Sequence, residues 1–567
     1  MIGVSNVRND RSSRDRFLSG VSVLTLSAVI VKVIGLACRI PLLNALGTEG
    51  MGYYNTACEV YALLCVLSTA GLPVAMSVTI SAAPARMGRA LTFRIFSVSL
   101  IAFLAVGVTG TLGLLLLADP LGRLLGSPDA APCIRAVAPT VLLICLSGAL
   151  RGWFQGSRNM TPTAVSQVIE ALGKLTLGLS FAAIARRGGN DLPHTAAAAV
   201  LGLTVGTAVS VAYLAVCKRR TDRRLPPVPI AETDAADLPG RREVLRRLLS
   251  VALPITVSAG VISLSKCLDL AMILRRMQDG GMSYADANAL WGCWSTLAVP
   301  LFNVLPALTT PVAMSAVPAL SETLHRLTAG GGQPETADLS PAARADREDA
   351  RRDAARTSGT AIGLTLLLSV PAGLGLYVSA GDVLALLFPA QPAAVAAAAP
   401  WLSLLGLSVP AACLVTVIGS MLQASGHASF PVVSMTAGLS LKLVLLYVLL
   451  GDPAVGMMGA PISSLCCDTL ILALDMAYLA RKVPGILPDA PALTALFCVP
   501  PALSLPALWL PRMILPSLGV TVTGGSPLET LLYIGTVAAL YGTGVLVILK
   551  IIRKKPFVKG NIPYADP

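Results

Sequence analysis

Long apolar segments alternate with short polar ones along most of the chain. About 20 apolar residues suffice to cross the hydrocarbon core of a bilayer. The segment 95–118 contains no charged residue, and neither does 357–380. The pattern predicts an all-α polytopic membrane protein with about fourteen transmembrane helices. These helices are expected near residues 20–42, 53–80, 95–118, 135–153, 163–185, 196–217, 248–274, 289–320, 357–380, 398–423, 430–450, 456–480, 491–511 and 528–551.

Composition and charge placement agree with a membrane protein. The 567 residues have a mean hydropathy of +0.74 and are only 13% charged, whereas soluble domains are roughly a quarter charged. The net charge of +13 does not indicate a nucleic-acid partner. If the amino terminus is cytoplasmic, 31 Lys and Arg residues fall on the cytoplasmic side and 7 on the other. This positive-inside bias predicts an even number of helices and two cytoplasmic termini.

Two short sequences occur twice along the chain. Pro-Val-Ala-Met-Ser at 73–77 recurs at 311–315, a shift of 238 residues. Gln155-Gly-Ser precedes a helix that carries Lys174, and Gln423-Ala-Ser precedes one that carries Lys442, a shift of 268. The shifts differ by 30 residues, which matches the extra length of one polar loop in the second half. One duplication explains both repeats and predicts two six-helix lobes in a parallel arrangement.

The duplication predicts an order of parts along the chain. These are a basic cytoplasmic N-terminus at 1–19, an N-lobe of six helices at 20–217, a cytoplasmic linker at 218–247, a C-lobe of six helices at 248–480 with a cytoplasmic loop at 321–356, two further helices within 491–551 and a cytoplasmic tail at 552–567.

Charged residues inside predicted membrane helices are the candidates for function. Such charges cost several kcal/mol in hydrocarbon, so they normally face protein or water. Lys32 lies near the middle of the first helix, and Arg39 shares its helix face seven residues later. No acidic residue of that helix neutralises them. Two cations on one face favour an anionic ligand such as a phosphate, although Arg39 could also extend to the membrane interface.

The other membrane-embedded charges allow several interpretations. Glu170 and Lys174 are four residues apart, which favours a structural ion pair within one helix over a role in transport. Lys266 and Asp269 could neutralise each other, but the repeat alignment places Lys266 about one turn from the counterpart of Lys32, so Lys266 is also a candidate ligand. The candidates for a cavity or for ion coupling are Glu59, Asp269, Lys442, Asp468 and Asp475, of which the last two share a helix face and could pair with Lys442.

Signals for catalysis are weak. The three histidines, at 194, 325 and 427, lie in loops or at helix ends, without carboxylates at metal-binding spacing. The glycine-rich run 47–52 follows no strand, which argues against a nucleotide-binding loop. We therefore expect no catalytic residues, no metal and no cofactor.

One family has similar sequence motifs. The motifs are Lys32-Val-Ile-Gly-Leu, Arg39-Ile-Pro, Leu46-Gly-Thr-Glu-Gly and Ser68-Thr-Ala-Gly-Leu-Pro-Val-Ala, together with the turns at Gln155 and Gln423. They resemble the stage V sporulation protein B and MurJ-like family of lipid II flippases and polysaccharide exporters, within the multidrug/oligosaccharidyl-lipid/polysaccharide superfamily. A basic residue that the lipid II flippases carry late in helix 2 has no counterpart around Ser68.

The resemblance implies two lobes around a central cavity and alternating access. The implied substrate is an undecaprenyl-diphosphate-linked cell-wall, spore-cortex or polysaccharide precursor, with the basic residues of helix 1 facing the diphosphate. Lys32, Arg39 and Lys266 are then the candidate substrate-binding residues. The alternatives are a cation-coupled multidrug exporter, a membrane glycosyltransferase or ligase, and a scaffold that transports nothing. Expected partners are the lipid-linked glycan, membrane lipids and the cell-wall synthesis machinery, for a monomer in the cell membrane.

Overall fold

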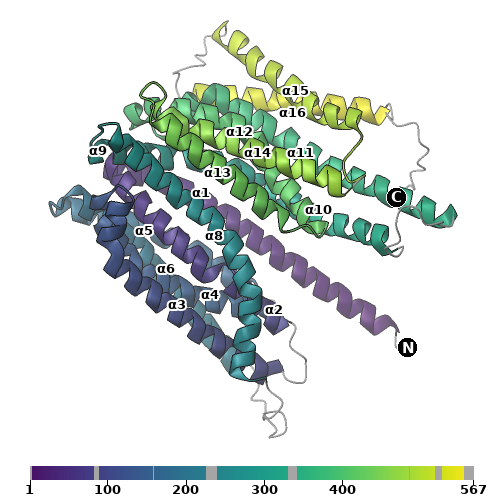
Figure 1. The fold of residues 1–567 in the computed structure, drawn as a ribbon, viewed down its shortest axis with the longest axis horizontal. Helices are drawn as coiled ribbons and strands as arrows, with labels where there is room; N and C mark the ends of the chain where they lie inside the picture. The colour runs from purple at the N-terminus through teal and green to yellow at the C-terminus, as the bar shows by residue number, and fades with distance from the viewer. Residues whose placement is uncertain are drawn as a thin grey trace. The chain divides into compact units, whose positions relative to one another are not determined.

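The computed structural model describes residues 3–81, 88–157, 159–224, 239–329, 341–483, 485–517 and 527–554. These residues form helices and contain no strand (Figure 1). The α-helices are α1 (Gly3–Thr69), α2 (Leu72–Ser81), α3 (Gly88–Leu124), α4 (Ala131–Gly156), α5 (Thr161–Arg187), α6 (Leu192–Arg224), α8 (Arg241–Asp279), α9 (Tyr284–Cys293), α10 (Val299–Ala329), α11 (Pro341–Leu387), α12 (Pro392–Ala424), α13 (Phe430–Leu450), α14 (Gly459–Lys482), α15 (Ala490–Ser517) and α16 (Pro527–Lys554). Shorter turns are η2 (Pro128–Ala130), the π-helix η3 (Trp294–Ala298) and η4 (Gly456–Met458).

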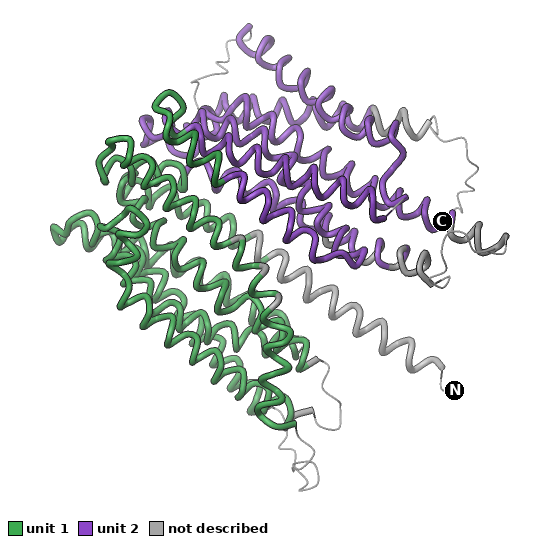
Figure 2. The backbone as a smooth tube through the Cα atoms, in the orientation of Figure 1, with its two compact units in different colours: residues 1–296, 443–457 green, residues 297–442, 458–567 purple. Residues whose placement is uncertain are grey.

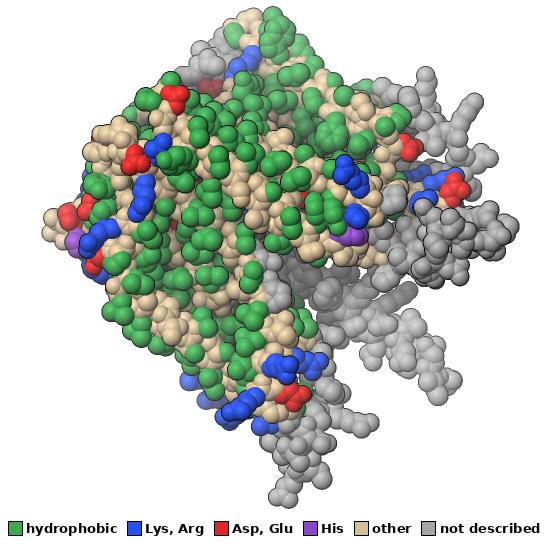
Figure 3. Space-filling view, in the orientation of Figure 1, with side chains coloured by type: hydrophobic (Ala, Val, Ile, Leu, Met, Phe, Trp, Pro, Cys, Tyr) green, Lys and Arg blue, Asp and Glu red, His purple; other side chains and the backbone are tan. Residues whose placement is uncertain are grey.

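Thirteen helical stretches in the described part of the chain are long and apolar enough to cross a membrane. The first stretch, Ile30–Ile80, covers two of the predicted helices, so the predicted all-α membrane fold is confirmed. Large apolar side chains remain exposed along the helices, as Leu116 and Trp509 do at 78% and 66%. Figure 3 shows apolar side chains over much of the visible face and charged side chains mostly toward its edges, a distribution that suits contact with lipid.

Gly47 divides α1 into two halves. Its φ of 69° and ψ of −178° break the helix, and few residues other than glycine adopt this backbone conformation. After the break, Gly52 faces α9 so closely that an added Cβ would collide with the carbonyl oxygen of Asn288. A Cβ at Gly292 of α9 would likewise collide with the carbonyl oxygen of Thr48. The glycine-rich run therefore makes a turn and a close helix contact.

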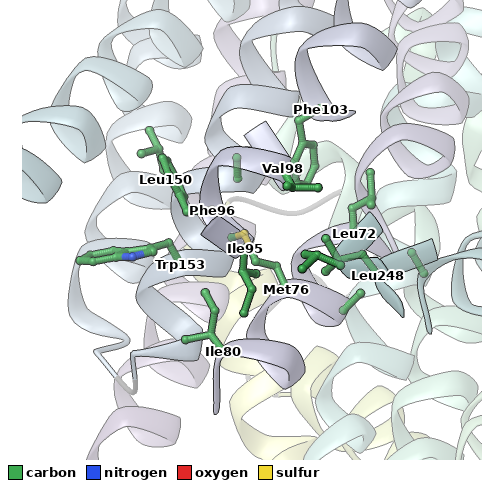
Figure 4. Close-up of a cluster of buried hydrophobic side chains, with 14 of the residues drawn as sticks. Leu72, Met76, Ile80, Ile95, Phe96, Val98, Phe103, Leu150, Trp153 and Leu248 are labelled. Carbon is green, nitrogen blue, oxygen red and sulfur yellow. The ribbon is translucent and has the colours of Figure 1, made fainter. Parts of the chain in front are cut away.

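The described chain forms two compact units (Figure 2). Unit 1 comprises residues 1–296 and 443–457, and unit 2 comprises residues 297–442 and 458–567. Helix α8 belongs to unit 1, because Leu248 packs into a buried cluster with side chains of α2, α3 and α4 (Figure 4). This division falls within η3, whereas the sequence places the boundary between lobes in the linker 218–247, of which 225–238 lie outside the described residues. The predicted lobes stay a prediction.

Each unit contains a similar set of helix neighbours. In unit 1, α4 packs against α2, α3 and α6, and in unit 2, α12 packs against α10, α11 and α14. The C-terminal ends of α4 and α12 are also alike. Ser157 follows α4 with φ −82° and ψ 9°, and Ser425 follows α12 with φ −84° and ψ 9°. The two Gln-containing turns noted in the sequence therefore have the same backbone geometry.

Arginine side chains reach backbone carbonyls where helices break or end. Arg186 donates to Ala45, two residues before the Gly47 break. Arg512 Nη2 donates to the Val378 carbonyl at 2.8 Å, beside Ser379, a non-helical residue within α11. Arg276 Nε donates to the Tyr447 carbonyl at 3.1 Å, in the last turn of α13. Arginines predicted on the outer side thus bind carbonyl groups where helices break or end.

The contact between α1 and α9 yields a test of packing. Gly292→Ala should lower the melting temperature and the monodisperse yield of the purified protein, because the new methyl group meets the Thr48 carbonyl and the helices must move apart. Gly535→Ala is the matched control, because a Cβ there meets no atom within 4 Å. Equal melting temperatures for the two variants would contradict the close helix contact.

Candidate functional site

Four of the predicted charged residues lie together in unit 1. The Glu59 carboxylate, in the second half of α1, is within electrostatic range of Lys266, Arg39 and Asp269. The Cys267 thiol donates to the Glu59 carbonyl oxygen at 3.4 Å, which joins α8 to α1. Because Gly47 folds α1 back, Arg39 and Glu59 come close although 20 residues separate them. We call Arg39, Glu59, Lys266 and Asp269 the charge cluster.

Arg39 is fixed by the π-helix η3. Its Nη1 donates to the Ser295 carbonyl at 2.6 Å. Asn55 Nδ2 lies 2.8 Å from both the Ser295 and the Thr296 hydroxyl oxygens, and Ser295 Oγ donates to the Trp291 carbonyl at 2.6 Å. A π-helix shifts the helical hydrogen bonds by one residue, and such segments are frequent at functional sites. Arg39 therefore has a protein partner rather than extending to the membrane interface.

Sequence reasoning missed Asn55, Ser295 and Thr296. Each lies in a predicted membrane helix, where an uncharged polar side chain does not stand out. The amide of Asn55 could have indicated a contact between helices, because a buried Asn needs several hydrogen-bond partners. Those partners come from residues 240 and 241 positions away, which helical periodicity does not indicate.

Lys32 and Lys266 are exposed side chains of unit 1. Lys32 precedes Arg39 by two turns of the same helix, about 10 Å along its axis. Lys32 forms no ion pair with any residue that the structure describes. Its ammonium group is therefore available to a ligand.

The predicted ion pair between Glu170 and Lys174 is wrong. Glu170 Oε2 instead lies 2.8 Å from Arg151 Nη2 of α4, and both side chains are largely buried, with 19% and 15% exposed. Arg151 Nε also donates to Ser166 Oγ at 3.0 Å. The planar guanidinium group of Arg151 binds two acceptors at once. The Lys174 ammonium, one helical turn from Glu170, would supply only a single point charge.

Lys174 lies over an aromatic ring instead. Its Nζ is 5.6 Å from the centre of the Tyr54 ring, in the second half of α1. Cation–π contacts of this kind contribute about 0.5–2 kcal/mol. Cys38 and Cys58 are also within electrostatic range of Lys174. No carboxylate among the described residues pairs with Lys174.

Unit 2 holds the remaining candidates. Asp468 of α14 accepts from the Ser408 hydroxyl and is within electrostatic range of Lys442. Asp475 accepts from Ser434 Oγ at 2.6 Å, and its side chain is fully buried. Hence Lys442 lies near Asp468, whereas Asp475 is hydrogen-bonded by the Ser434 hydroxyl. Two of the three candidate residues of unit 2 are thus acidic.

No group of three His, Cys, Asp or Glu residues within the described part of the chain could hold a metal ion. All twelve cysteines are free thiols.

The Arg151–Glu170 pair yields a test of stability. Arg151→Gln should destabilise the protein by about 3–5 kcal/mol, because it leaves a buried carboxylate without its cation. Thermal unfolding in detergent would show the loss, and the double variant with Glu170→Gln should recover part of it. Asp119→Asn is the control, because its pair with Arg135 is 48% exposed and should contribute only about 0–1 kcal/mol.

This chain is similar in sequence and fold to known proteins. Stage V sporulation protein B of Bacillus subtilis (strain 168) is 25% identical over 83% of this chain and 85% of its own length. Lipid II flippase MurJ of the same organism is 24% identical over 83% and 82%. A solved inward closed structure of lipid II flippase MurJ has a TM-score of 0.67 at 11% identity, over 93% of this chain and 99% of that one. An inward-facing MATE family multidrug transporter has a TM-score of 0.60 at 16% identity, over 82% and 98%.

Two family models match successive parts of the chain. The model described as MatE matches residues 348–448. The model described as polysaccharide biosynthesis protein matches residues 17–324, which is more than half of the chain. The chain is a multi-pass membrane protein and belongs to the polysaccharide biosynthesis protein family.

Proposed function

We propose that this protein is a flippase that moves an undecaprenyl-diphosphate-linked glycan precursor across the cytoplasmic membrane by alternating access. The observation that carries the proposal is the set of cations in unit 1: Lys32 has no carboxylate partner among the described residues, and Arg39 and Lys266 both lie within electrostatic range of Glu59. A diphosphate cannot cross hydrocarbon without shelter for its charge. Lysine and arginine supply that shelter, because their N–H groups form strong charge-assisted hydrogen bonds to phosphate.

The three cations have different roles in this proposal. Lys32 offers a mobile point charge that binds and releases a phosphate readily. Lys266 is exposed on α8 and approaches the same region from another helix. Arg39 retains its bond to Ser295 through Nη1, and its other donors are directed to the ligand. The flippase functions as a monomer without catalytic chemistry, and its two termini lie in the cytoplasm beside the cell-wall synthesis machinery.

A cation-coupled multidrug exporter is the second candidate function. It is favoured by the structural likeness to a MATE family transporter and by the buried Asp475 and the partly buried Asp468, which suit a coupling cation. An exporter of cationic drugs needs carboxylates where the drug binds, however. The unpaired Lys32 of unit 1 is unfavourable for such a substrate.

Lys32 provides the test of the flippase proposal. Lys32→Ala should abolish complementation of a flippase-deficient strain at normal protein abundance, because the diphosphate loses a counter-charge within the membrane. Lys32→Arg should retain part of the activity, because it keeps the charge. Lys482→Ala, a change at an exposed lysine at the end of α14, is the control and should complement fully. Full complementation by Lys32→Ala at equal expression would remove the main support for an anionic substrate.

The proposed orientation has its own test. In a cysteine-free background, a cysteine at Ala235, which lies outside the described residues, should react with a membrane-impermeant thiol reagent only after the cells are opened. A cysteine at Asp191, between α5 and α6, should react in intact cells. We expect this pattern because the orientation puts 31 Lys and Arg residues on the cytoplasmic side and 7 on the other side. The reverse labelling pattern would overturn the cytoplasmic placement of the termini.

A further inference from the structure

Lys174 is a membrane-embedded cation whose expected partner is engaged elsewhere. Glu170 is bound at 2.8 Å by Arg151, which also donates to Ser166. Lys174 has no carboxylate partner among the described residues and is only partly buried on α5. A positive charge in this position needs an anion, water or an aromatic face. In the structure, the Lys174 ammonium group lies over the face of the Tyr54 ring.

Tyr54 connects Lys174 with the charge cluster. Its ring lies beneath the Lys174 ammonium at 5.6 Å, and its hydroxyl is within electrostatic range of Arg39. Cys38, which precedes Arg39 in the first half of α1, is also within electrostatic range of Lys174. Cys58, in the second half of α1, is within electrostatic range of Lys174 as well, and α1 packs against α5. Lys174 therefore approaches the hairpin beside Arg39, from a different helix than Lys266.

The balance of charge indicates what Lys174 is for. Within the cluster, Glu59 and Asp269 offset Arg39 and Lys266. Lys32 then supplies one excess positive charge, whereas a diphosphate diester carries about two negative charges, one on each phosphate. Arg151 contributes no excess, because Glu170 offsets it. Among the described cations in this part of unit 1, Lys174 supplies the second positive charge that would balance the diphosphate.

We infer that Lys174 is a further ligand of the substrate diphosphate. It binds the second phosphate, while Lys32, Arg39 and Lys266 hold the first, and the Tyr54 ring holds the ammonium when no substrate is present. This inference rests on the proposed flippase function and specifies how its site distinguishes a diphosphate from a monophosphate. A cation–π contact is weaker than an ion pair with phosphate, so the ligand displaces the ring without a large barrier. Lysine suits this exchange because its stem is flexible.

The test measures lipid binding by the full-length protein in phosphatidylcholine nanodiscs. Lys174→Gln should weaken binding of undecaprenyl diphosphate about tenfold, and should change binding of undecaprenyl phosphate less than twofold. Lys174→Arg should retain most of the affinity. Lys174→Met is the second charge-removing variant, because its apolar stem preserves the packing against Tyr54. The melting temperature of the Lys174→Met protein verifies that this variant is folded.

Lys218→Gln is the matched control. Lys218 also lies over aromatic rings, 4.5 Å from that of Phe96 and 4.9 Å from that of Trp153, but it is paired with Asp222 at 2.7 Å. Its substitution should leave both affinities unchanged. The inference is overturned by unchanged diphosphate binding in folded Lys174→Gln or Lys174→Met, by an equal loss for the two lipids, or by the same loss in Lys218→Gln.

Two further results separate this inference from the proposal on which it rests. If the wild-type protein binds undecaprenyl diphosphate but Lys174→Gln binds it equally well, only the role of Lys174 fails. If the wild-type protein does not bind undecaprenyl diphosphate, the flippase proposal fails and the role of Lys174 fails with it. Phosphatidylglycerol is the competing source of phosphate, and competition as strong as that by undecaprenyl diphosphate would show a headgroup site instead.

Discussion

A backbone carbonyl that has lost its helical partner must find another donor, because hydrocarbon supplies none. Most of this protein's helices keep helical backbone geometry throughout. Where they are interrupted, at Gly47, in η3 and at Ser379, an arginine from a distant part of the chain donates to a carbonyl at or near the interruption: Arg186, Arg39 and Arg512 respectively. The first two interruptions allow α1 to fold back and α9 to approach it, so the charge cluster depends on the bonds made by Arg186 and Arg39.

This constraint gives the arginines and the lysines different roles. Arginine carries five donors on a planar group, so it can satisfy a carbonyl and still present N–H groups elsewhere. Arg151 uses the same property to bind Glu170 and Ser166 together. The lysines Lys32, Lys174 and Lys266 have no comparable attachment to the backbone among the described residues. In the proposed flippase, the charges of these lysines follow the ligand, while the arginines maintain the framework around it.

The sequence predicted the fold class well and the contacts between distant helices poorly. Apolar segments of sufficient length determine where membrane helices occur, and charged residues within them are conspicuous, so Arg39, Glu59, Lys266 and Asp269 were found individually. Helical spacing indicates only which residues share a face of one helix. It therefore paired Glu170 with Lys174, although α4 supplies a better partner in Arg151. Asn55 and the π-helix went unnoticed, because uncharged polar residues and a single shifted turn leave no periodic signal.

The π-helix η3 also determines the rotational setting of α10, which follows it directly. One turn of a π-helix accommodates about one residue more than an α-helical turn, and one residue corresponds to about 100° of rotation and 1.5 Å of rise in an α-helix. If these five residues took up regular α-helical geometry, every later residue of α10 would present a different face. The Arg39 and Asn55 bonds to Ser295 and Thr296 hold the segment in its present register. Two side chains of α1 thus hold the π-helical turn at the end of unit 1, from which the chain continues into α10.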